Sequence, residues 1–254
     1  GMNNIQIKRF KRMLANLPGG PIEFPTFSPE LDEAEAARFA LVTDLIKSTK
    51  KKEYIIIFIG STTPYSSDQS STRNFSQGDR PSDWYDNDPG LQPVCSFSNL
   101  VALTAQAVGI PLILFKISYD DKPMWFTSMS GEELWNNKGS FPCVYLKTEE
   151  KGARWISDSD VIVNIFETEF QDRIEALNPT PSTLCPENIY KENVFFKSFP
   201  YIQGKDADDP FRAMCEEQYF KPLNDYLTAT NHDFLDGSRM GLKDAKFAFF
   251  ACMV

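Results

Sequence analysis

Short apolar runs and amphipathic stretches alternate along the middle of the chain. Residues 55–59 and 110–115 are almost wholly apolar over five or six positions, a length typical of buried strands and too short to cross a membrane. Between them, residues 96–108 carry apolar side chains at helical spacing, and Gly109 and Pro111 follow, as is common after a helix ends. The pattern predicts strand, helix, strand.

A second set of elements follows. The segments "CVYLKT" (143–148) and "RWIS" (154–157) are typical of strands, with turn residues between them, and residues 158–170 predict a helix. A helical connection through Gly139 joins the two sets. Strand, helix and strand, followed by a hairpin and a helix, is the thioredoxin-type α/β layout, a mixed sheet flanked by helices, over residues 53–170.

Residues 28–52 predict a further helix ahead of the first strand. Ser28 fits an N-cap with Pro29 at the first helical position, while acidic residues crowd the first turns and lysines close the end. One buried face is expected from the apolar positions Phe39, Leu41, Val42, Leu45 and Ile46.

The chain divides into four parts by composition. We expect an N-terminal extension with one helix at 1–49 and a thioredoxin-like domain at 50–172, interrupted by a polar insertion at 61–92 without helical or strand periodicity. A proline-rich linker follows at 173–186. The remaining residues, 187–254, have a wholly helical pattern.

Composition excludes several classes of function. A net charge of −9 argues against nucleic acid as a partner, which needs a concentrated positive surface. The only histidine is His232 and no C-x-x-C pair occurs, so we expect neither a Cys/His metal site nor a histidine-based catalytic group. The start of the chain lacks the apolar stretch of a secretion signal. The five widely spaced cysteines therefore predict reduced thiols in the cytoplasm: Cys95, Cys143, Cys185, Cys215 and Cys252.

Cys95 stands at the predicted start of a helix, and two interpretations are open. Partial positive charge and free N–H groups at a helix N-terminus stabilise a thiolate and lower the pKa of a thiol, which gives a nucleophile without a histidine base. Alternatively, Cys95 is a small buried apolar residue. With Ser98 three residues on, the C-x-x-S pattern cannot close its own disulfide, so a partner thiol such as glutathione has to resolve any mixed disulfide.

Two further places support thiol chemistry. Pro142 directly precedes a predicted strand, where a cis peptide bond exposes backbone for pairing with a peptide ligand. Asp158 and Ser159 begin the next helix. They fit an ordinary N-cap, and the same free N–H groups and carboxylate also fit a notch for an anion or amine.

The motifs "CSFS", "DKPMWF", "FPCVYL" and "DSDVI", in this order over about residues 93–170, resemble those of the plant dehydroascorbate reductases and chloride intracellular channel proteins of the glutathione transferase superfamily. The tail "FLDGSRMGLKDAKFAFF" resembles the start of a core helix in that superfamily. The resemblance implies a thioredoxin-like domain followed by an all-α domain. Because the sequence stops at Val254 within the implied core helix, we expect either a truncated chain or a reduced helical domain.

The resemblance also implies roles for individual residues. Cys95 would form the mixed disulfide with glutathione, and Lys122 would pair with the glycyl carboxylate of the tripeptide. Phe141, before the cis-proline Pro142, would bind the cysteinyl unit through its backbone. The γ-glutamyl end would be held by Asp158 and Ser159. As alternatives, Lys122 is a solvated charge and Phe141 is part of the core.

This chain departs from the family pattern around the cysteine. Val94 replaces an acidic residue and Ser96 replaces a proline. A lysine of the first strand is absent from residues 55–58, and Gly241 replaces the Ser/Thr cap of the core helix, where Asp244 is kept. The first and third changes remove polar groups that could orient dehydroascorbate.

We therefore expect a glutathione-dependent thiol transferase or reductase, with glutathione as co-substrate, no metal, and a small oxidised or disulfide substrate. Dehydroascorbate reduction and general thiol transfer both stay open. The alternative is a non-catalytic interaction or redox-sensing module of the same fold, which associates with membranes if it follows the channel proteins. No segment has the length for membrane insertion.

Overall fold

The computed structural model describes residues 25–63, 87–130, 134, 139–177, 217, 221–235, 237 and 239–251. These fall into two compact units. The first, here called the sheet unit, comprises the described residues up to 102 and residues 110–162. The second, the helical unit, comprises residues 103–109 and the described residues from 163 onward. Most of the predicted linker and the first part of the predicted helical domain lie outside the described residues.

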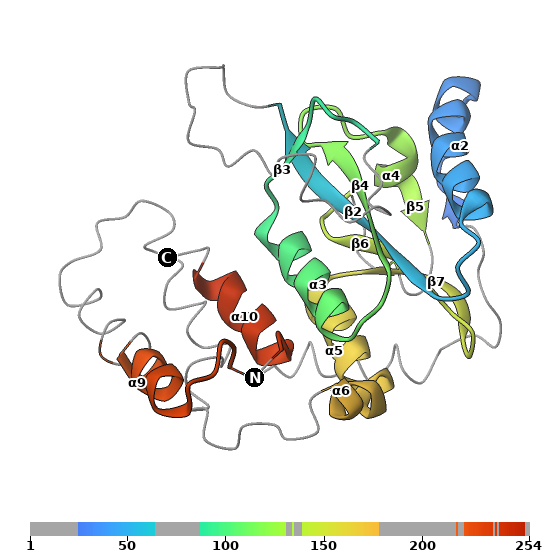
Figure 1. Ribbon diagram of the computed structural model, residues 1–254. Coiled ribbons are helices and arrows are strands. Elements are labelled where there is room, and N and C mark those ends of the chain that lie inside the picture. Colours follow the sequence, from blue (N-terminus) through green and yellow to red (C-terminus); the bar gives the residue numbers. More distant parts are fainter. Residues whose placement is uncertain are drawn as a thin grey trace, which may run out of the picture. The chain divides into compact units, whose positions relative to one another are not determined.

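The centre of the sheet unit is a mixed β-sheet (Figure 1). Strand β2 (Tyr54–Thr62) pairs in parallel with β4 (Leu112–Ser118) and antiparallel with β6 (Cys143–Thr148). β6 continues antiparallel into β7 (Gly152–Ser157). The parallel strand–helix–strand unit and the hairpin predicted from the sequence are both confirmed.

The polar insertion joins the sheet at its two ends, which the periodicity did not predict. β2 runs on to Thr62, and β3 (Gln92–Pro93) returns antiparallel to its last two residues. Ser61 pairs with Ser118 of β4 and with Pro93 of β3 at once. A strand residue has one partner on each edge, so β3 lies on the edge of β2 opposite β4.

The returning part of the insertion is also fixed to β4. The side-chain amide of Asn87 exchanges two hydrogen bonds with the backbone of Lys116, at 2.6 and 2.9 Å. The buried Lys116 ammonium donates to the carbonyls of Asp88 (2.7 Å) and Leu91 (2.9 Å). A buried ammonium needs such partners, and these bonds place the chain at β3, directly ahead of Cys95.

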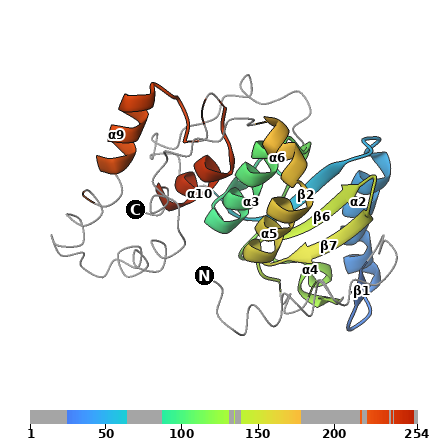
Figure 2. The same cartoon turned by 90° about the horizontal axis from the view of Figure 1, so that it is seen from below.

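Helices lie on both faces of the sheet (Figure 2). α3 (Ser96–Ala107) and α5 (Ser159–Glu169) begin in the sheet unit on one face. α2 (Glu33–Ser48) and the short α4 (Met124–Ser128) lie on the other. This arrangement confirms the predicted thioredoxin-like layout and shows that the helix of the N-terminal extension covers the sheet face next to α4.

Alternation along β2 explains the two-sided burial. Successive strand side chains point to opposite faces, and residues 54–59 are all fully buried. Phe58 stacks on Trp155 of β7 at 5.4 Å and contacts Trp125 of α4 edge-on at 5.7 Å. Phe39 of α2 joins this aromatic cluster. Burying each such side chain stabilises the fold by about 2–3 kcal/mol.

α2 starts later than the sequence predicted. Asp32, not Ser28, is its N-cap, and the Asp32 carboxylate accepts the backbone N–H of Glu35 at 2.8 Å. The backbone N–H of Ser28 instead donates to the carbonyl of Ser128. Next to it, β1 (Thr26–Phe27) pairs with β5 (Met129–Ser130). The expected burial of Leu41 is also wrong, since its side chain is 61% exposed while Phe39, Val42 and Ile46 are buried.

The described part of the helical unit contains α6 (Gln171–Leu177), α9 (Lys221–Thr230) and α10 (Leu242–Ala251). The Asp244 carboxylate accepts the N–H groups of Gly241 (2.9 Å) and Leu235 (2.7 Å), which fixes the start of α10 as a capping box does. No helix in the described ranges is long and apolar enough to cross a membrane.

Candidate functional site

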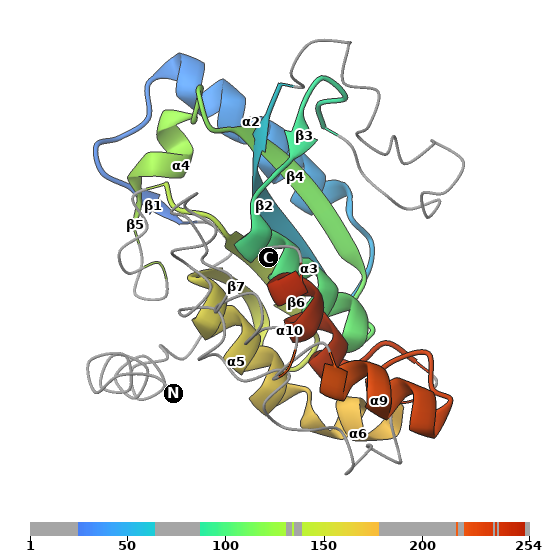
Figure 3. The same ribbon diagram turned by 90° about the vertical axis from the view of Figure 1, so that its left-hand side faces the viewer.

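The chain passes from β3 into α3 (Figure 3). Cys95 is the residue directly before this helix, and it lies beside the end of β2. The carbonyl of Gly60 accepts the backbone N–H groups of Val94 (3.1 Å) and Cys95 (3.3 Å). The carbonyl of Cys95 in turn accepts the N–H of Asn99 at 3.0 Å, the first bond of the helix. Cys95 therefore occupies the position before the first helical residue, as the sequence predicted.

The Cys95 side chain is a free thiol and is only 6% exposed. Its neighbour Val94 is 50% exposed, and Tyr119 is 41% exposed. These are two of the large apolar side chains that the described surface leaves open to solvent. The thiol is thus covered, but apolar and aromatic groups near it face solvent.

Tyr119 reaches Cys95 by crossing over Gly60. It follows β4, and its backbone N–H donates to the carbonyl of Ser61 at 2.9 Å. A Cβ placed on Gly60 would lie 2.5 Å from Cζ of the tyrosine and 2.6 Å from its hydroxyl oxygen. Only glycine leaves room for the ring there, so the phenol lies above the strand end whose carbonyl binds Cys95.

The Tyr119 phenol lies close enough to the Cys95 side chain for the two to interact. Burial raises the pKa of the phenol above its ordinary value, and the interaction with Cys95 raises it further. The phenol therefore stays protonated and can donate to the sulfur. Sequence analysis missed Tyr119, because nothing in the local pattern links a residue after one strand to a glycine ending another.

Lys122 and Phe141 continue this group of contacts. Phe141 meets Tyr119 edge-on at 5.1 Å and stacks on Phe126 at 5.0 Å. The Lys122 ammonium lies 4.9 Å from the centre of the Phe141 ring and 5.6 Å from that of Tyr119. It also donates to the carbonyl of Gly139 at 2.7 Å. Lys122 is thus partly buried and held in place, which makes it more than a solvated surface charge.

The bond between Phe141 and Pro142 is cis, which confirms that prediction. The carbonyl of Pro142 accepts the backbone N–H of Asp158 at 3.4 Å. Asp158 has a positive φ of 83° and its carboxylate accepts the N–H of Asp160 at 2.9 Å. Asp158 therefore caps α5, and the Ser159 side chain beside it is buried.

The predicted residues thus form two connected groups. Direct contacts link Cys95, Tyr119, Phe141 and Lys122, and a hydrogen bond links Pro142 to Asp158. The Phe141–Pro142 peptide joins the two groups. Roles of these residues in binding glutathione remain predictions.

Cys143, the other free cysteine of the described chain, has very different surroundings. Its side chain is fully buried in the aromatic core between the sheet and α2. Burial raises the pKa of the Cys143 thiol well above its ordinary value. A neutral, enclosed thiol is a poor nucleophile.

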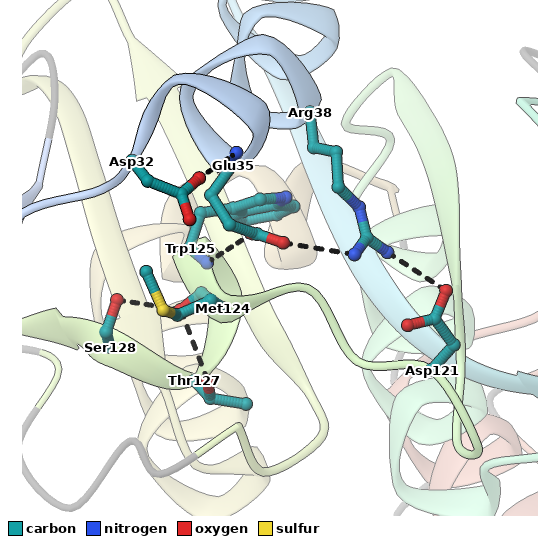
Figure 4. Close-up of polar contacts among 8 residues, drawn as sticks. All are labelled: Asp32, Glu35, Arg38, Asp121, Met124, Trp125, Thr127 and Ser128. Carbon is teal, nitrogen blue, oxygen red and sulfur yellow. Dashed lines mark hydrogen bonds and ion pairs between the residues drawn. The ribbon is translucent and has the colours of Figure 1, made fainter.

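The N-terminal extension contacts the segment that carries Lys122 (Figure 4). The Glu35 carboxylate of α2 accepts the backbone N–H of Trp125 at 3.0 Å and a side-chain N–H of Arg38 at 3.1 Å. Arg38 also donates to Asp121 at 3.2 Å. Glu35 thereby satisfies a free N–H in the first turn of α4, and residues 121–125 are held against α2.

No group of three potential His, Cys, Asp or Glu ligands gathers within the described residues. The chemistry that these residues can offer is that of a thiol with a hydrogen-bond donor, a nearby cation and aromatic surface.

No protein-family model matches the chain. Individual proteins do. Glutathione S-transferase DHAR2 of Arabidopsis thaliana is 28% identical over 163 residues, which is 63% of this chain and 67% of that protein. A probable glutathione S-transferase DHAR1 of Oryza sativa subsp. japonica, named as cytosolic, is 27% identical over 61% of this chain and 64% of its own length. Another Arabidopsis relative, named as chloroplastic, is 26% identical, with 52% of its length aligned.

Solved structures with a similar chain path include a dehydroascorbate reductase of Chlamydomonas reinhardtii. It is 19% identical, with a TM-score of 0.47, and the match covers 79% of this chain and 75% of that one. Glutathione transferase Omega 2S of Trametes versicolor is 13% identical, with a TM-score of 0.42, and covers 80% and 73%.

The sequence match spans about half to two thirds of the length of the relatives. It includes both cytosolic and chloroplastic proteins, so it does not select a compartment. The resemblance to plant proteins of the glutathione transferase superfamily, inferred from the motifs around Cys95, is confirmed by these relatives, to which the chain is similar over 61–63% of its length.

Proposed function

We propose that the protein is a glutathione-dependent thiol transferase or reductase that acts through a mixed disulfide on Cys95. The observation that carries this proposal is the place of Cys95, a free thiol directly before α3 with the Tyr119 phenol near it. A helix N-terminus and a nearby hydrogen-bond donor each favour a thiolate in general, and the thiolate is the nucleophile.

The thiol-transfer reaction balances with two glutathione equivalents. The Cys95 thiolate attacks the glutathione sulfur of a mixed disulfide; a new S–S bond forms, the old one breaks, and the substrate leaves as a thiolate that takes a proton from solvent. A second glutathione thiolate then attacks the glutathione sulfur bound to Cys95. Glutathione disulfide leaves and the Cys95 thiolate is restored.

Glutathione would lie along the two groups of contacts around the cis-proline. Phe141 and Pro142 would offer backbone groups to the cysteinyl unit, Lys122 would pair with the glycyl carboxylate, and Asp158 with Ser159 would hold the γ-glutamyl end. The partly buried, fixed position of Lys122 beside Phe141 supports this assignment.

The surroundings of the thiol bear on the second substrate. Dehydroascorbate, a small polar molecule, would take up two electrons and two protons from two glutathione molecules. Val94 and Tyr119, which are exposed near Cys95, offer it no charge. An apolar rim of this kind favours a disulfide with an apolar portion over dehydroascorbate.

A second candidate function is a redox-sensing module, in which glutathionylated Cys95 is itself the signal. It is favoured by one observation, the 6% exposure of Cys95. A buried thiol reacts only when the surrounding residues move and expose it. A reaction rate limited in this way suits a sensor better than an enzyme with many turnovers.

The test is incubation with glutathione disulfide, followed by peptide mass spectrometry of every cysteine, and turnover assays with glutathione. We expect the glutathione adduct on Cys95 and none on Cys143. Turnover of a model mixed disulfide supports the enzyme, and an adduct without turnover supports the sensor.

Cys95→Ser is the blank for both experiments, and Lys122→Met tests the binding site. The methionine keeps the aliphatic contact with Phe141 and removes the charge. We expect the KM for glutathione to rise about tenfold with Lys122→Met, because the ion pair between the Lys122 ammonium and the glycyl carboxylate of glutathione is lost. Absence of any Cys95 adduct in the native protein contradicts the proposed function.

A further inference from the structure

We propose that Tyr119 is a catalytic hydrogen-bond donor to the Cys95 sulfur, held in position by the absence of a side chain at Gly60. This inference rests on the proposed function of Cys95 and deepens it, because it assigns to this chain's own tyrosine the stabilisation of the reacting thiolate.

The geometry around Gly60 supports the first step. The tyrosine ring lies within 2.6 Å of where a Cβ of residue 60 would stand, and the carbonyl of that residue accepts the N–H of Cys95. The phenol and the cysteine therefore meet over the same strand end. This meeting is the basis for inferring a hydrogen bond from the Tyr119 hydroxyl to the Cys95 sulfur, and the interaction with Cys95 that contributes to the raised pKa of the phenol agrees with it.

The ring is fixed from three sides. The Tyr119 backbone N–H is bonded to the carbonyl of Ser61 at 2.9 Å, Phe141 packs edge-on at 5.1 Å, and the Lys122 ammonium lies 5.6 Å from the ring centre. A donor that is already oriented costs little to hold in place during reaction, and that is the condition for electrostatic stabilisation of a developing or existing anion.

The surroundings of Tyr119 and Cys95 bear on which of the two residues donates the hydrogen bond. Lys122 is cationic and lies over the two rings, and the helix start of α3 carries partial positive charge. A positive charge and a helix N-terminus in general stabilise an anion that lies beside them. Burial of the phenol keeps its proton on oxygen, so the proton is donated toward sulfur and not the reverse.

A hydrogen bond to a thiolate has two opposite effects on rate. It increases the thiolate fraction at neutral pH, and it lowers the nucleophilicity of each thiolate. Removing the Tyr119 hydroxyl should therefore change the reaction rate of Cys95 in opposite directions at neutral and at alkaline pH, which loss of a purely structural contact would not do.

The experiment compares the native protein with Tyr119→Phe, which removes the hydroxyl and keeps the ring over Gly60. The rate of Cys95 alkylation by iodoacetamide is measured against pH. We expect the midpoint of the profile to move about one pH unit higher in the variant, as loss of a hydrogen bond to a charged group implies. The rate should fall about threefold at neutral pH and rise about threefold on the alkaline plateau.

Tyr226→Phe is the matched control. It also removes a tyrosine hydroxyl with a buried hydrogen bond, to the carbonyl of Leu235 at 3.0 Å, but in the helical unit. Its Cys95 profile should match that of the native protein. Where alkylation is slow because the thiol is covered, ultraviolet titration of the thiolate, referenced to Cys95→Ser, gives the same midpoint without a reagent.

The outcomes separate the two proposals. An unchanged midpoint in Tyr119→Phe, or a rate scaled equally at every pH, overturns the role of Tyr119 even if glutathione still forms its adduct on Cys95. A shifted midpoint in a protein that forms no glutathione adduct keeps the role of Tyr119 and contradicts the glutathione-dependent function.

Discussion

Two buried thiols in one sheet unit, Cys95 before α3 and Cys143 at the start of β6, differ in what surrounds the sulfur. Both are free and nearly or fully covered. Cys95 has a helix start and a tyrosine hydroxyl, whereas Cys143 is enclosed by the aromatic core. The comparison teaches that burial by itself does not determine thiol chemistry, because polar partners on the sulfur decide which charge state is stable.

The largest expected effect comes from removing each thiol in turn. Of the two described cysteines, we expect only Cys95 to form the glutathione adduct, because it lies at a helix start near a hydroxyl group. Cys95→Ser should therefore abolish this adduct, whereas Cys143→Ala should leave it unchanged. Peptide mass spectrometry measures both. Persistence of an equal adduct on Cys143 in the Cys95→Ser protein would break the comparison.

Gly60→Ala tests whether the tyrosine contact depends on the missing side chain. The new methyl group would meet the Tyr119 ring at 2.5 Å, so the ring must move and the free energy of unfolding should fall by about 1–3 kcal/mol. The Cys95 pH profile should shift in the same direction as in Tyr119→Phe. Urea denaturation and alkylation measure the two effects.

Gly90→Ala is the control for that substitution. Its Cβ would meet only the Asp88 carboxylate, at 3.2 Å, in an exposed turn. We expect little loss of stability and an unchanged Cys95 profile. A Gly60→Ala protein with native stability and a native profile contradicts the crowding seen over the strand end.

Cys143 gives a prediction for alkaline pH. Its pKa is raised in the folded state, so its contribution to stability is complete below the ordinary thiol pKa of about 8.5 and is lost as pH rises toward the folded value. The unfolded chain releases this proton first, which lowers the free energy of unfolding by about 1.4 kcal/mol per pH unit. Urea denaturation between roughly pH 8 and 10 measures this effect. The free energy of unfolding should fall less steeply with pH in Cys143→Ala than in the native protein. An unchanged slope contradicts the enclosed thiol.

The smallest expected effect concerns the link from α2 to the Lys122 segment. Glu35→Gln keeps an acceptor for the N–H of Trp125 but removes the charge facing Arg38. We expect a loss of about 0.5–1 kcal/mol in the free energy of unfolding. Glu33→Gln, on the exposed first turn of the same helix, is the control. Equal losses from both substitutions mean that the ion pair between Glu35 and Arg38 contributes nothing.

Local pattern was sufficient for the main elements of the sheet unit. Apolar runs placed β2 and β4, and the helix between them begins at Ser96 as predicted. The N-terminal helix was misplaced at its start because Ser28 and Asp32 are both acceptable caps. Ser28 is used by a contact with Ser128, 100 residues away, which no local rule contains.

Candidate residues were found where a motif coincided with an element boundary. Cys95, Pro142 and Asp158 all lie at such boundaries, and the structure places them there. Tyr119 was missed because its importance depends on the register of β2 against β4. That register sets Gly60 beside Ile117 and Ser61 beside Ser118, and it carries the next residue across the strand end.

The sequence by itself determined the order of strands and helices, the helix-start position of Cys95 and the resemblance to glutathione transferases, because these depend on periodicity, caps and short motifs. Only the tertiary structure decided that Tyr119 lies near Cys95, that Cys143 is enclosed, and that α2 holds the Lys122 segment. Those outcomes depend on which side chains meet across strands and layers, and packing of distant residues is not encoded in any single local pattern.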